Sequence, residues 1–339
     1  MGPVTLAGST TRVVLFTEVN SKFGMPFLED LALSPGVTVV GVVTSPAGKV
    51  CDYYVGEPDP VDIAEYAGWL GIPVFRPGNV NDDHVVAALR SLAPDYLVIA
   101  NYQQIFRDQL LAVPARAVVN FHPSPLPRYA GLAPFFWMAL AGERDSGVTA
   151  LLTTRGIDNG PVLAQRPVAF AGTETVGQVR DALFAESREL LHDMIPRLLA
   201  GDLSGKPQDL RRRTYFSSPK PQDMTVDWSS PLETISRLIR ACSPQSGAAI
   251  SPDGAVRILE ARPVPGQPAP GRLGEVIVDP DYGLVIGAID GRLQVTSLSW
   301  DPAAANVPAD VLEPVKAAAT AGLSPVTIAM HHGHRLQEA

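Results

Sequence analysis

The stretch Asn120–Pro134 places an amide, an imidazole and a hydroxyl within five residues, at Asn120, His122 and Ser124. The largely apolar run Arg116–Val119 before them is typical of a buried strand, and the prolines that follow prevent either strand or helix from continuing. We therefore expect the three side chains on a stiff loop at the exit of that strand. Polar side chains gathered at such a place indicate a functional site. The alternative is a proline-rich turn with one solvated histidine, and this stretch alone does not decide between them.

A second polar turn follows downstream. The run Ser146–Leu152 reads as another strand, and it leads into the acidic, glycine-bearing turn Asp158–Pro161. In an alternating α/β chain, ligands bind at the carboxyl ends of the parallel strands. The two segments together therefore predict one site.

The two segments also resemble a known family. The pattern Asn-x-His-x-Ser-x-Leu-Pro (residues 120–127), then Gly-Val-Thr (147–149), then Asp-x-Gly-Pro (158–161) is similar to the signature of the folate-dependent formyltransferases. These include the methionyl-tRNA, sugar-amine and glycinamide-ribonucleotide enzymes. The resemblance implies N10-formyltetrahydrofolate as formyl donor and a catalytic trio of Asn120, His122 and Asp158.

Formyl transfer explains why these residue types are needed. An amine attacks an amide-like carbonyl, so the oxygen becomes negative and the nitrogen must lose a proton. Asn120 can donate a hydrogen bond to that oxygen, an effect of about 2.7–4 kcal/mol in comparable sites. His122 can transfer the proton, either as base or as a protonated stabiliser of the oxygen, and Asp158 would orient it. Ser124 has a positioning role, with plain turn capping as the alternative.

The resemblance also implies contacts to the donor. The loop after the predicted strand 96–100 would lend main-chain groups of Gln104, Ile105 and Phe106 to the pterin ring. The turn before Asp158 would add Thr154, Gly156 and Ile157. For the first loop the structural alternative is a helix start in which Ile105 and Phe106 pack inward.

Bulk properties set the class of protein. A length of 339 residues with 46% hydrophobic content is enough for two domains. Cys51 and Cys242 lie far apart, so we expect neither a disulfide scaffold nor a metal site, and a cytoplasmic location fits. We expect no membrane span, because no apolar run approaches about 20 residues. Nothing in the sequence indicates the oligomeric state.

Alternating elements predict an α/β fold, a Rossmann-like, doubly wound, mostly parallel sheet with helices on both faces. A nicotinamide dinucleotide site is not expected, since no Gly-x-Gly-x-x-Gly follows the first strand. The predicted strands are 11–17, 37–44, 73–75 and 96–100, and the predicted helices are 26–33, 61–67 and 84–92.

The second half of the chain changes character. A long amphipathic helix over 173–201 should close a formyltransferase domain at 1–205, and the polar stretch 206–225 reads as a linker. Short strands separated by Gly, Pro and Asp then predict a small OB-like β-barrel at 226–339, as the resemblance also implies. The arginine run at 211–213 is either a solvated face or a phosphate contact.

Two features of the sequence bear on the acceptor, namely departures from the family's pattern and the distribution of charge. The family's usual Ser-Leu-Leu-Pro is Ser-Pro-Leu-Pro at 124–127, and the Arg that commonly precedes Gly131 is Ala130, although Arg128 could substitute for it. From Lys220 to Ala339, nine Lys or Arg stand against thirteen Asp or Glu, and the whole chain has a formal net charge of −8.

A tRNA-binding surface needs positive charge. We therefore predict transfer to an amine or hydroxylamine of a small metabolite, such as an amino sugar or a siderophore or natural-product intermediate, and do not expect tRNA as a partner. The alternative is a methionyl-tRNA formyltransferase. A formyltetrahydrofolate hydrolase and a non-catalytic folate-binding protein are further readings.

Overall fold

The computed structural model describes residues 10–19, 22–49, 62–244, 247–250, 254–266, 272–300 and 309–321. It divides into two compact units. The first comprises the chain up to Pro134 together with Asp145–Ala169 and Arg180–Phe216, and the second comprises Phe135–Arg144, Phe170–Val179 and the chain from Ser217 onward.

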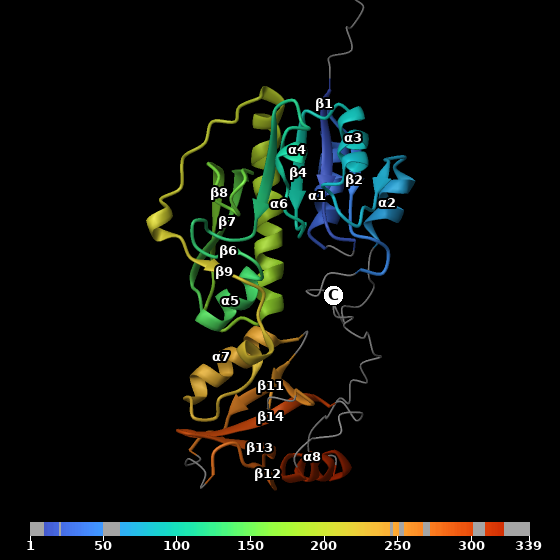
Figure 1. Ribbon diagram of the computed structural model, residues 1–339. Helices are drawn as coiled ribbons and strands as arrows, with labels where there is room; N and C mark the ends of the chain where they lie inside the picture. Colours follow the sequence, from blue (N-terminus) through green and yellow to red (C-terminus); the bar gives the residue numbers. More distant parts are fainter. Residues whose placement is uncertain are drawn as a thin grey trace, which may run out of the picture. The chain divides into compact units, whose positions relative to one another are not determined.

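A seven-stranded sheet forms the centre of the first unit (Figure 1), in the order β3-β2-β1-β4-β5-β7-β8. The first five strands in this order run parallel, whereas β7 is antiparallel to β5 and β8 is antiparallel to β7. The predicted parallel-dominated α/β sheet is confirmed. The strands are β1 (Thr11–Phe16), β2 (Val37–Val43), β3 (Val74–Phe75), β4 (Tyr96–Ala100), β5 (Ala117–His122), β7 (Asp145–Leu152) and β8 (Val162–Ala169).

Helices cover both faces of this sheet. On one face, Phe27 of α1 (Gly24–Leu33) packs edge-on against Phe121 of β5. Arg188 of α6 (Val176–Ala200) joins Asp30 of α1 through hydrogen bonds of 2.6 and 2.7 Å. On the other face, α3 (Asp83–Ser91) buries its apolar stripe in a cluster with side chains of β1, β2, β4 and β5. The remaining helices of this unit are α2 (Ile63–Trp69) and α4 (Asp108–Leu111).

The strand that leads into the predicted site is longer than expected. β5 continues through Asn120 and His122, because residues 119–122 pair with β7 on one side while residues 117–121 pair with β4 on the other. The prediction that Asn120 and His122 lie on a loop is therefore wrong, and only Ser124 does. The strand therefore ends at His122, three residues later than expected and directly before Pro123.

The predicted linker contributes to the first unit over its first part. Within residues 206–216, a short 3-10 helix, η2 (Leu210–Arg212), is followed by β9 (Tyr215–Phe216). β9 pairs in parallel with β6 (Ala130–Gly131), in the loop after β5. This part of the chain therefore lies against the loop that follows the strand of Asn120 and His122.

The second unit contains a five-stranded antiparallel sheet in the order β10-β11-β14-β13-β12. The helix α7 (Leu232–Cys242) buries Ile235, Leu238 and Ile239, the predicted stripe. The strands are β10 (Ala248–Ala249), β11 (Val256–Pro263), β12 (Val276–Asp279), β13 (Gly283–Ala288) and β14 (Gly291–Trp300); the unit also holds most of α5 (Pro134–Ala141), η3 (Pro221–Met224) and α8 (Ala309–Ala321).

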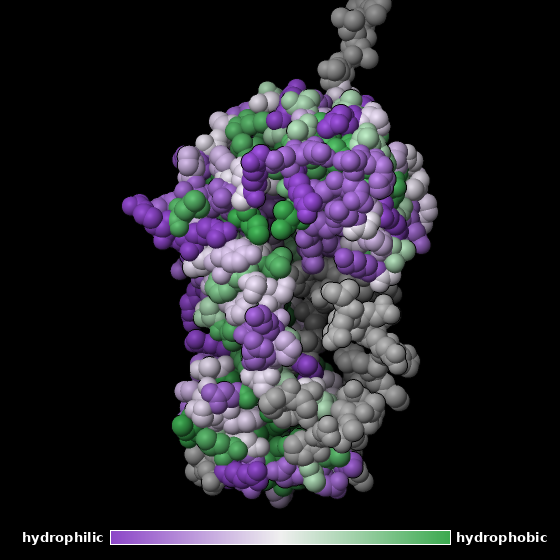
Figure 2. Space-filling model, in the orientation of Figure 1, coloured by the Kyte–Doolittle hydropathy of each residue, from purple (hydrophilic) through white to green (hydrophobic). Residues whose placement is uncertain are grey.

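The surface shows no extended apolar band on the face drawn in Figure 2, where hydrophobic residues form separate patches among hydrophilic ones. Within the described part of the chain, no helix combines the length and apolar character needed to cross a membrane.

Candidate active site

Asn120 and His122 project from the same face of β5. Successive side chains of a strand alternate between its faces, so Phe121 points toward α1 while its two polar neighbours share the face of Val118, which packs in the cluster with α3. Asn120 stands opposite Ile99 of β4 and Leu151 of β7, at the carboxyl end of the parallel strands. The pairing of β5 with β4 and β7 thus places the Asn120 amide and the His122 imidazole next to each other on one face of the sheet.

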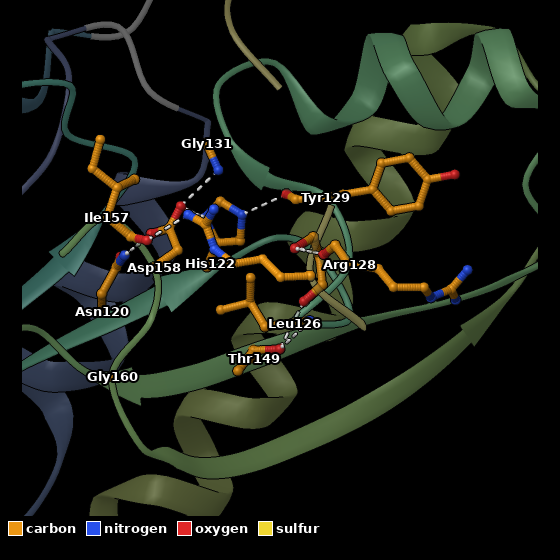
Figure 3. A network of polar contacts seen from close by, with 12 residues as sticks. Asn120, His122, Leu126, Arg128, Tyr129, Gly131, Thr149, Ile157, Asp158 and Gly160 are labelled. Carbon is orange, nitrogen blue, oxygen red and sulfur yellow. Dashed lines mark hydrogen bonds and ion pairs between the residues drawn. The ribbon is translucent and has the colours of Figure 1, made fainter. Parts of the chain in front are cut away.

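Asp158 reaches the same place from the loop between β7 and β8. Its backbone is left-handed, with φ of 49°, an uncommon conformation for a residue other than glycine. Gly160 turns the loop back so tightly that a Cβ there would lie 1.8 Å from the carbonyl oxygen of Leu152. The Asp158 side chain lies between its partners (Figure 3), with Oδ1 3.5 Å from Asn120 Nδ2 and Oδ2 3.7 Å from His122 Nδ1. The structure therefore brings the three predicted catalytic side chains together.

The imidazole of His122 is buried and held at both nitrogens. Its Nε2 lies 3.0 Å from the carbonyl oxygen of Tyr129. A carbonyl oxygen can only accept a hydrogen bond, so Nε2 carries a proton, and Nδ1 is the nitrogen that can gain or lose one. Because Nδ1 faces Asp158, the carboxylate stabilises the ring when it is positively charged.

A backbone N–H completes the surroundings of the carboxylate. Gly131 donates a hydrogen bond of 2.8 Å to Asp158 Oδ2. Its φ of 97° and the 2.2 Å that would separate a Cβ from the carbonyl oxygen of Phe216 admit only glycine at this position. The sequence interpretation missed both Tyr129 and Gly131, because they act through backbone atoms, which residue type does not reveal.

Ser124 is fully buried and supports the loop, and its N–H donates to the carbonyl oxygen of His122 at 2.8 Å. Its Oγ donates to the carbonyl oxygen of Arg128 at 3.0 Å, and its own carbonyl accepts from Thr149 Oγ1 at 2.7 Å. Gln165 of β8 adds bonds to Thr149 Oγ1 and to the carbonyl of Leu126, at 2.8 and 2.7 Å. The hydroxyl thus closes the turn, and the neighbouring strands fix that turn in place.

Arg128 does not stand in for the arginine that Ala130 replaces. Its guanidinium group extends away from Asp158 (Figure 3) and donates to the carbonyl oxygen of Asp145. It also stacks near the Tyr129 ring, 5.8 Å from the centroid. In this structure Arg128 therefore steadies the loop and does not face the trio.

A pocket of about 590 Å³ opens beside the loop that follows β4. Ile105 and Phe106 line it; Ile105 is 63% exposed, whereas Phe106 packs on Phe16. An apolar wall next to polar main chain suits a flat heteroaromatic ring such as a pterin. The remaining lining residues are Asn81, Asp83, Arg107, Asp108, Gln109 and Arg155.

Side-chain amides shape this loop. Gln104 accepts from the N–H of Val80 at 2.7 Å through Oε1, so its side chain fixes a neighbouring turn. Asn81 donates to the carbonyl of Ile105 at 2.9 Å and accepts from the N–H of Arg107 at 2.8 Å. These bonds hold the predicted donor-binding loop in one conformation, although the Ile105 carbonyl is already occupied.

The other predicted donor contacts lie on the Asp158 loop. Thr154 donates from Oγ1 to Asn159 Oδ1 at 2.7 Å, and a Cβ on Gly156 would lie 2.1 Å from the same side-chain amide. Ile157 is 40% exposed. An ion pair between Arg155 and Asp108 joins this loop to α4. Arg155 lines the pocket, whereas Thr154, Gly156 and Ile157 are not among its lining residues.

One titratable group nearby departs from its ordinary behaviour. Burial raises the pKa of the Tyr102 phenol, and the Glu18 carboxylate raises it further. Tyr102 therefore stays protonated and neutral, packed edge-on against Phe16. Among the residues that the structure describes, no group of three or more His, Cys, Asp or Glu side chains could hold a metal ion.

The amino-acid sequence matches two models of one protein family. Residues 11–195 match the family model described as formyl transferase, and residues 219–308 match the one described as formyl transferase, C-terminal domain. The chain belongs to the formyl transferase family. The predicted resemblance, the class of enzyme and N10-formyltetrahydrofolate as co-substrate are thereby confirmed for this formyltransferase.

Similar proteins include the methionyl-tRNA formyltransferases of three bacteria. The protein of Acidithiobacillus ferrooxidans is 34% identical over 84% of this chain and 90% of its own length. That of Geobacter metallireducens is 31% identical over 82% and 88%. That of Chloroflexus aurantiacus is 38% identical over 67% and 72%.

Solved structures show the same fold at lower identity. An N-formyltransferase from Helicobacter canadensis, in complex with folinic acid and dTDP-3-aminofucose, has a TM-score of 0.60 and 17% identity, covering 84% of this chain and 97% of that one. HypX from Aquifex aeolicus, in complex with tetrahydrofolic acid, has a TM-score of 0.58 and 19% identity; this formyltransferase spans 86% of its own length there but only 44% of that chain.

The relatives overturn two predictions about the acceptor. Proteins 31–38% identical to this formyltransferase are named methionyl-tRNA formyltransferase, so the prediction of a small-metabolite acceptor is wrong, and so is the expectation that tRNA is not a partner. The error came from net charge, which sums over a domain and does not report how the positive groups are arranged.

Proposed function

We propose that this formyltransferase transfers the formyl group of N10-formyltetrahydrofolate to the amino group of methionyl-tRNA. The observation that carries this proposal is the match to methionyl-tRNA formyltransferases through 82–84% of this chain and 88–90% of theirs. Such a match includes the second unit as well as the catalytic one. The geometry around Asp158 supports the same chemistry.

The chain's own residues supply the acid, the base and the oxygen stabiliser. The bound donor supplies an activated formyl carbon; a bond forms between it and the amine nitrogen, its bond to N10 breaks, and one proton passes from the amine to the folate product. Asn120 is proposed to donate to the formyl oxygen as that oxygen becomes negative. His122 takes the amine proton at Nδ1, since Nε2 is committed to Tyr129. Asp158 holds the positive ring in place.

The loops on either side of the pocket fit the donor. We assign main-chain groups of Gln104, Ile105 and Phe106 to one side of the ring and the segment from Thr154 to Ile157 to the other. The pocket between Ile105 and Arg155 supports this assignment.

Three further proposals concern organisation. We propose that the five-stranded sheet of the second unit closes as an OB-like barrel, and that the chain divides into a catalytic domain at 1–205, a linker at 206–225 and a C-terminal domain at 226–339. The two family models, at 11–195 and 219–308, support this division. We place the enzyme in the cytoplasm, where aminoacylated tRNA is made.

The decisive experiment incubates the pure protein with N10-formyltetrahydrofolate and methionylated initiator tRNA, then measures formyl-methionine released from the tRNA by mass spectrometry. His122→Ala, purified in the same way, controls for a contaminating host enzyme. A reaction without tRNA, assayed for formate, tests for a hydrolase. We expect formyl-methionine with the wild type alone, in a salt-sensitive reaction. Formate release without any formylated tRNA would contradict the proposal.

A further inference from the structure

The segment 206–216, which we call the strap, holds the loop that carries Asp158. Gln208 donates from Nε2 to the carbonyl oxygens of Asp158 and Gly160, at 2.9 and 2.8 Å. Arg213 donates to the carbonyl oxygen of Ile157 at 2.9 Å. Three of the four carbonyls between residues 157 and 160 are thus bound by side chains of the strap.

These bonds act where the backbone needs support. A non-glycine residue with φ of 49° persists only when its surroundings fix it, and Asp158 is such a residue. The side-chain nitrogen of Gln208 carries two N–H groups, and it donates to the carbonyl oxygens of both Asp158 and Gly160. Its Oε1 is buried and meets no donor among the described residues, so the amide gives up one of its own hydrogen bonds at this position.

The strap also holds the loop that contacts His122. Thr214 accepts from the N–H of Tyr129 at its Oγ1, 2.8 Å away, and its carbonyl accepts from Ala130 at 3.0 Å. β9 then pairs with β6, which contains Gly131. Tyr129 and Gly131 are the residues whose backbone atoms bind His122 and Asp158. One segment therefore fixes the backbone partners of both catalytic side chains.

We propose that the strap positions the catalytic trio and that Gln208 is its main positioning residue, acting through the Asp158 carbonyl. The inference concerns formyl transfer itself and rests on the proposed function only for the acceptor used to measure it. These hydrogen bonds of Gln208 go to backbone carbonyls of the Asp158 loop and not to the side chains of the trio. Removal of Gln208 should leave the bound donor in place while the Asp158 carboxylate shifts away from His122 Nδ1 and the Gly131 N–H.

The test uses Gln208→Met, which keeps an unbranched side chain without N–H groups, and Gln208→Glu, which keeps the shape. Gln222→Leu, at an exposed glutamine farther along the chain, is the matched control. Formylation of methionyl-tRNA is measured for each variant, alone and combined with Asp158→Asn, across pH 5.5–9. A misplacement of about 1 Å can slow a reaction about 100-fold. We therefore expect kcat to fall at least about tenfold in both Gln208 variants, with the KM for donor within about twofold.

Three readouts separate a positioning role from a purely structural one. If Gln208 acts through Asp158, its substitution has no further effect in the Asp158→Asn background, and the pH profile of the single variants changes shape. Hydrogen–deuterium exchange at the peptide containing Gly131 should quicken in the Gln208 variants but not in Gln222→Leu. The exchange measurement needs no acceptor.

Two results would overturn the inference. One is an unchanged kcat with unchanged exchange at Gly131 in both Gln208 variants. The other is a double variant, Gln208→Met with Asp158→Asn, whose loss of kcat equals the product of the losses in the two single variants. A wild type that leaves methionyl-tRNA unformylated would contradict the proposed function instead, and the exchange result would then decide the role of the strap by itself.

Discussion

The carbonyl oxygen of Tyr129 lies 3.0 Å from Nε2 of His122, and this contact determines which nitrogen of the ring can do chemistry. With Nε2 committed as a donor, Nδ1 alone is open to a proton, and it faces Asp158. A backbone atom, which no substitution of Tyr129 removes, thus fixes the tautomer of the proposed base.

The first prediction concerns the trio. Asn120→Ala, His122→Ala and Asp158→Ala should each lower turnover by about 10²–10⁴-fold, because each removes one part of a single charge-stabilising unit. Combining His122→Ala with Asp158→Ala should add little to the larger single effect. Steady-state formylation rates check this, with circular dichroism to show that the fold is retained. Near wild-type turnover in His122→Ala would refute the mechanism.

The second prediction concerns Gly131. Gly131→Ala combines a left-handed backbone with a Cβ 2.2 Å from the Phe216 carbonyl, so the free energy of unfolding should fall by about 1–3 kcal/mol. Turnover should also fall, because the N–H to Asp158 must move. Gly71→Ala, with φ of 69° and nothing within 4 Å of the added Cβ, is the control for strain alone. Equal turnover in the two variants would show that the Gly131 N–H is not needed for catalysis.

The third prediction concerns the donor pocket. Ile105→Asp should raise the KM for N10-formyltetrahydrofolate at least about tenfold, since a carboxylate replaces the apolar wall beside the ring. The melting temperature should hardly change, because Ile105 is 63% exposed. Leu33→Asp, at a leucine that is 81% exposed on α1, tests whether any surface aspartate has the same effect. A KM for the donor equal to that of the wild type in Ile105→Asp would show that the donor does not bind against Ile105.

The fourth prediction concerns pH and stability at the α1–α6 contact. Burial would raise the pKa of the Asp30 carboxyl, but the hydrogen bond and charge of Arg188, with a smaller effect of His192, outweigh it and hold that pKa below its ordinary 3.8. Because this pKa is lowered in the folded protein, the contact stabilises the fold fully above the ordinary pKa of 3.8. That stabilisation is lost as pH falls through the folded pKa. Glu29, 3.9 Å from Arg188, also faces this pair.

Asp30→Asn should therefore lower the melting temperature by about 2–4 °C at pH 7, if the loss is about 1 kcal/mol. The difference from wild type should shrink as pH falls below 3.8. Calorimetry between pH 3 and 7 checks both statements. A constant difference across that range would mean that packing, and not the ionised carboxylate, is what the substitution removes.

Local patterns in the sequence were enough for much of the fold. The apolar runs at 37–44 and 96–100 lie within one residue of β2 and β4, because buried parallel strands are continuously apolar. The end of β5 was misplaced by the prolines at 123, 125 and 127. They limit how far a strand can run, but pairing with β7 decides how much of that length is used.

The site was predictable only in part. The types and spacing of Asn120, His122 and Asp158 pointed to one place, and the structure brings them together. Their partners were not predictable, because Tyr129 and Gly131 act through the backbone and Gln208 comes from about 50 residues away in the chain. The polar composition of residues 206–216 is equally typical of a solvated linker and of a segment whose amides bind carbonyls.

Pairing between β6 and β9 has a consequence for the order of events during synthesis. Gly131 is made 84 residues before Tyr215, the first residue of the strand that pairs with it. Before Phe216 has emerged from the ribosome, the nascent chain can already form β1 to β5. It still lacks the hydrogen bonds that hold Tyr129 and Gly131. On the proposal above, the catalytic centre is therefore completed only after most of the first unit has been translated.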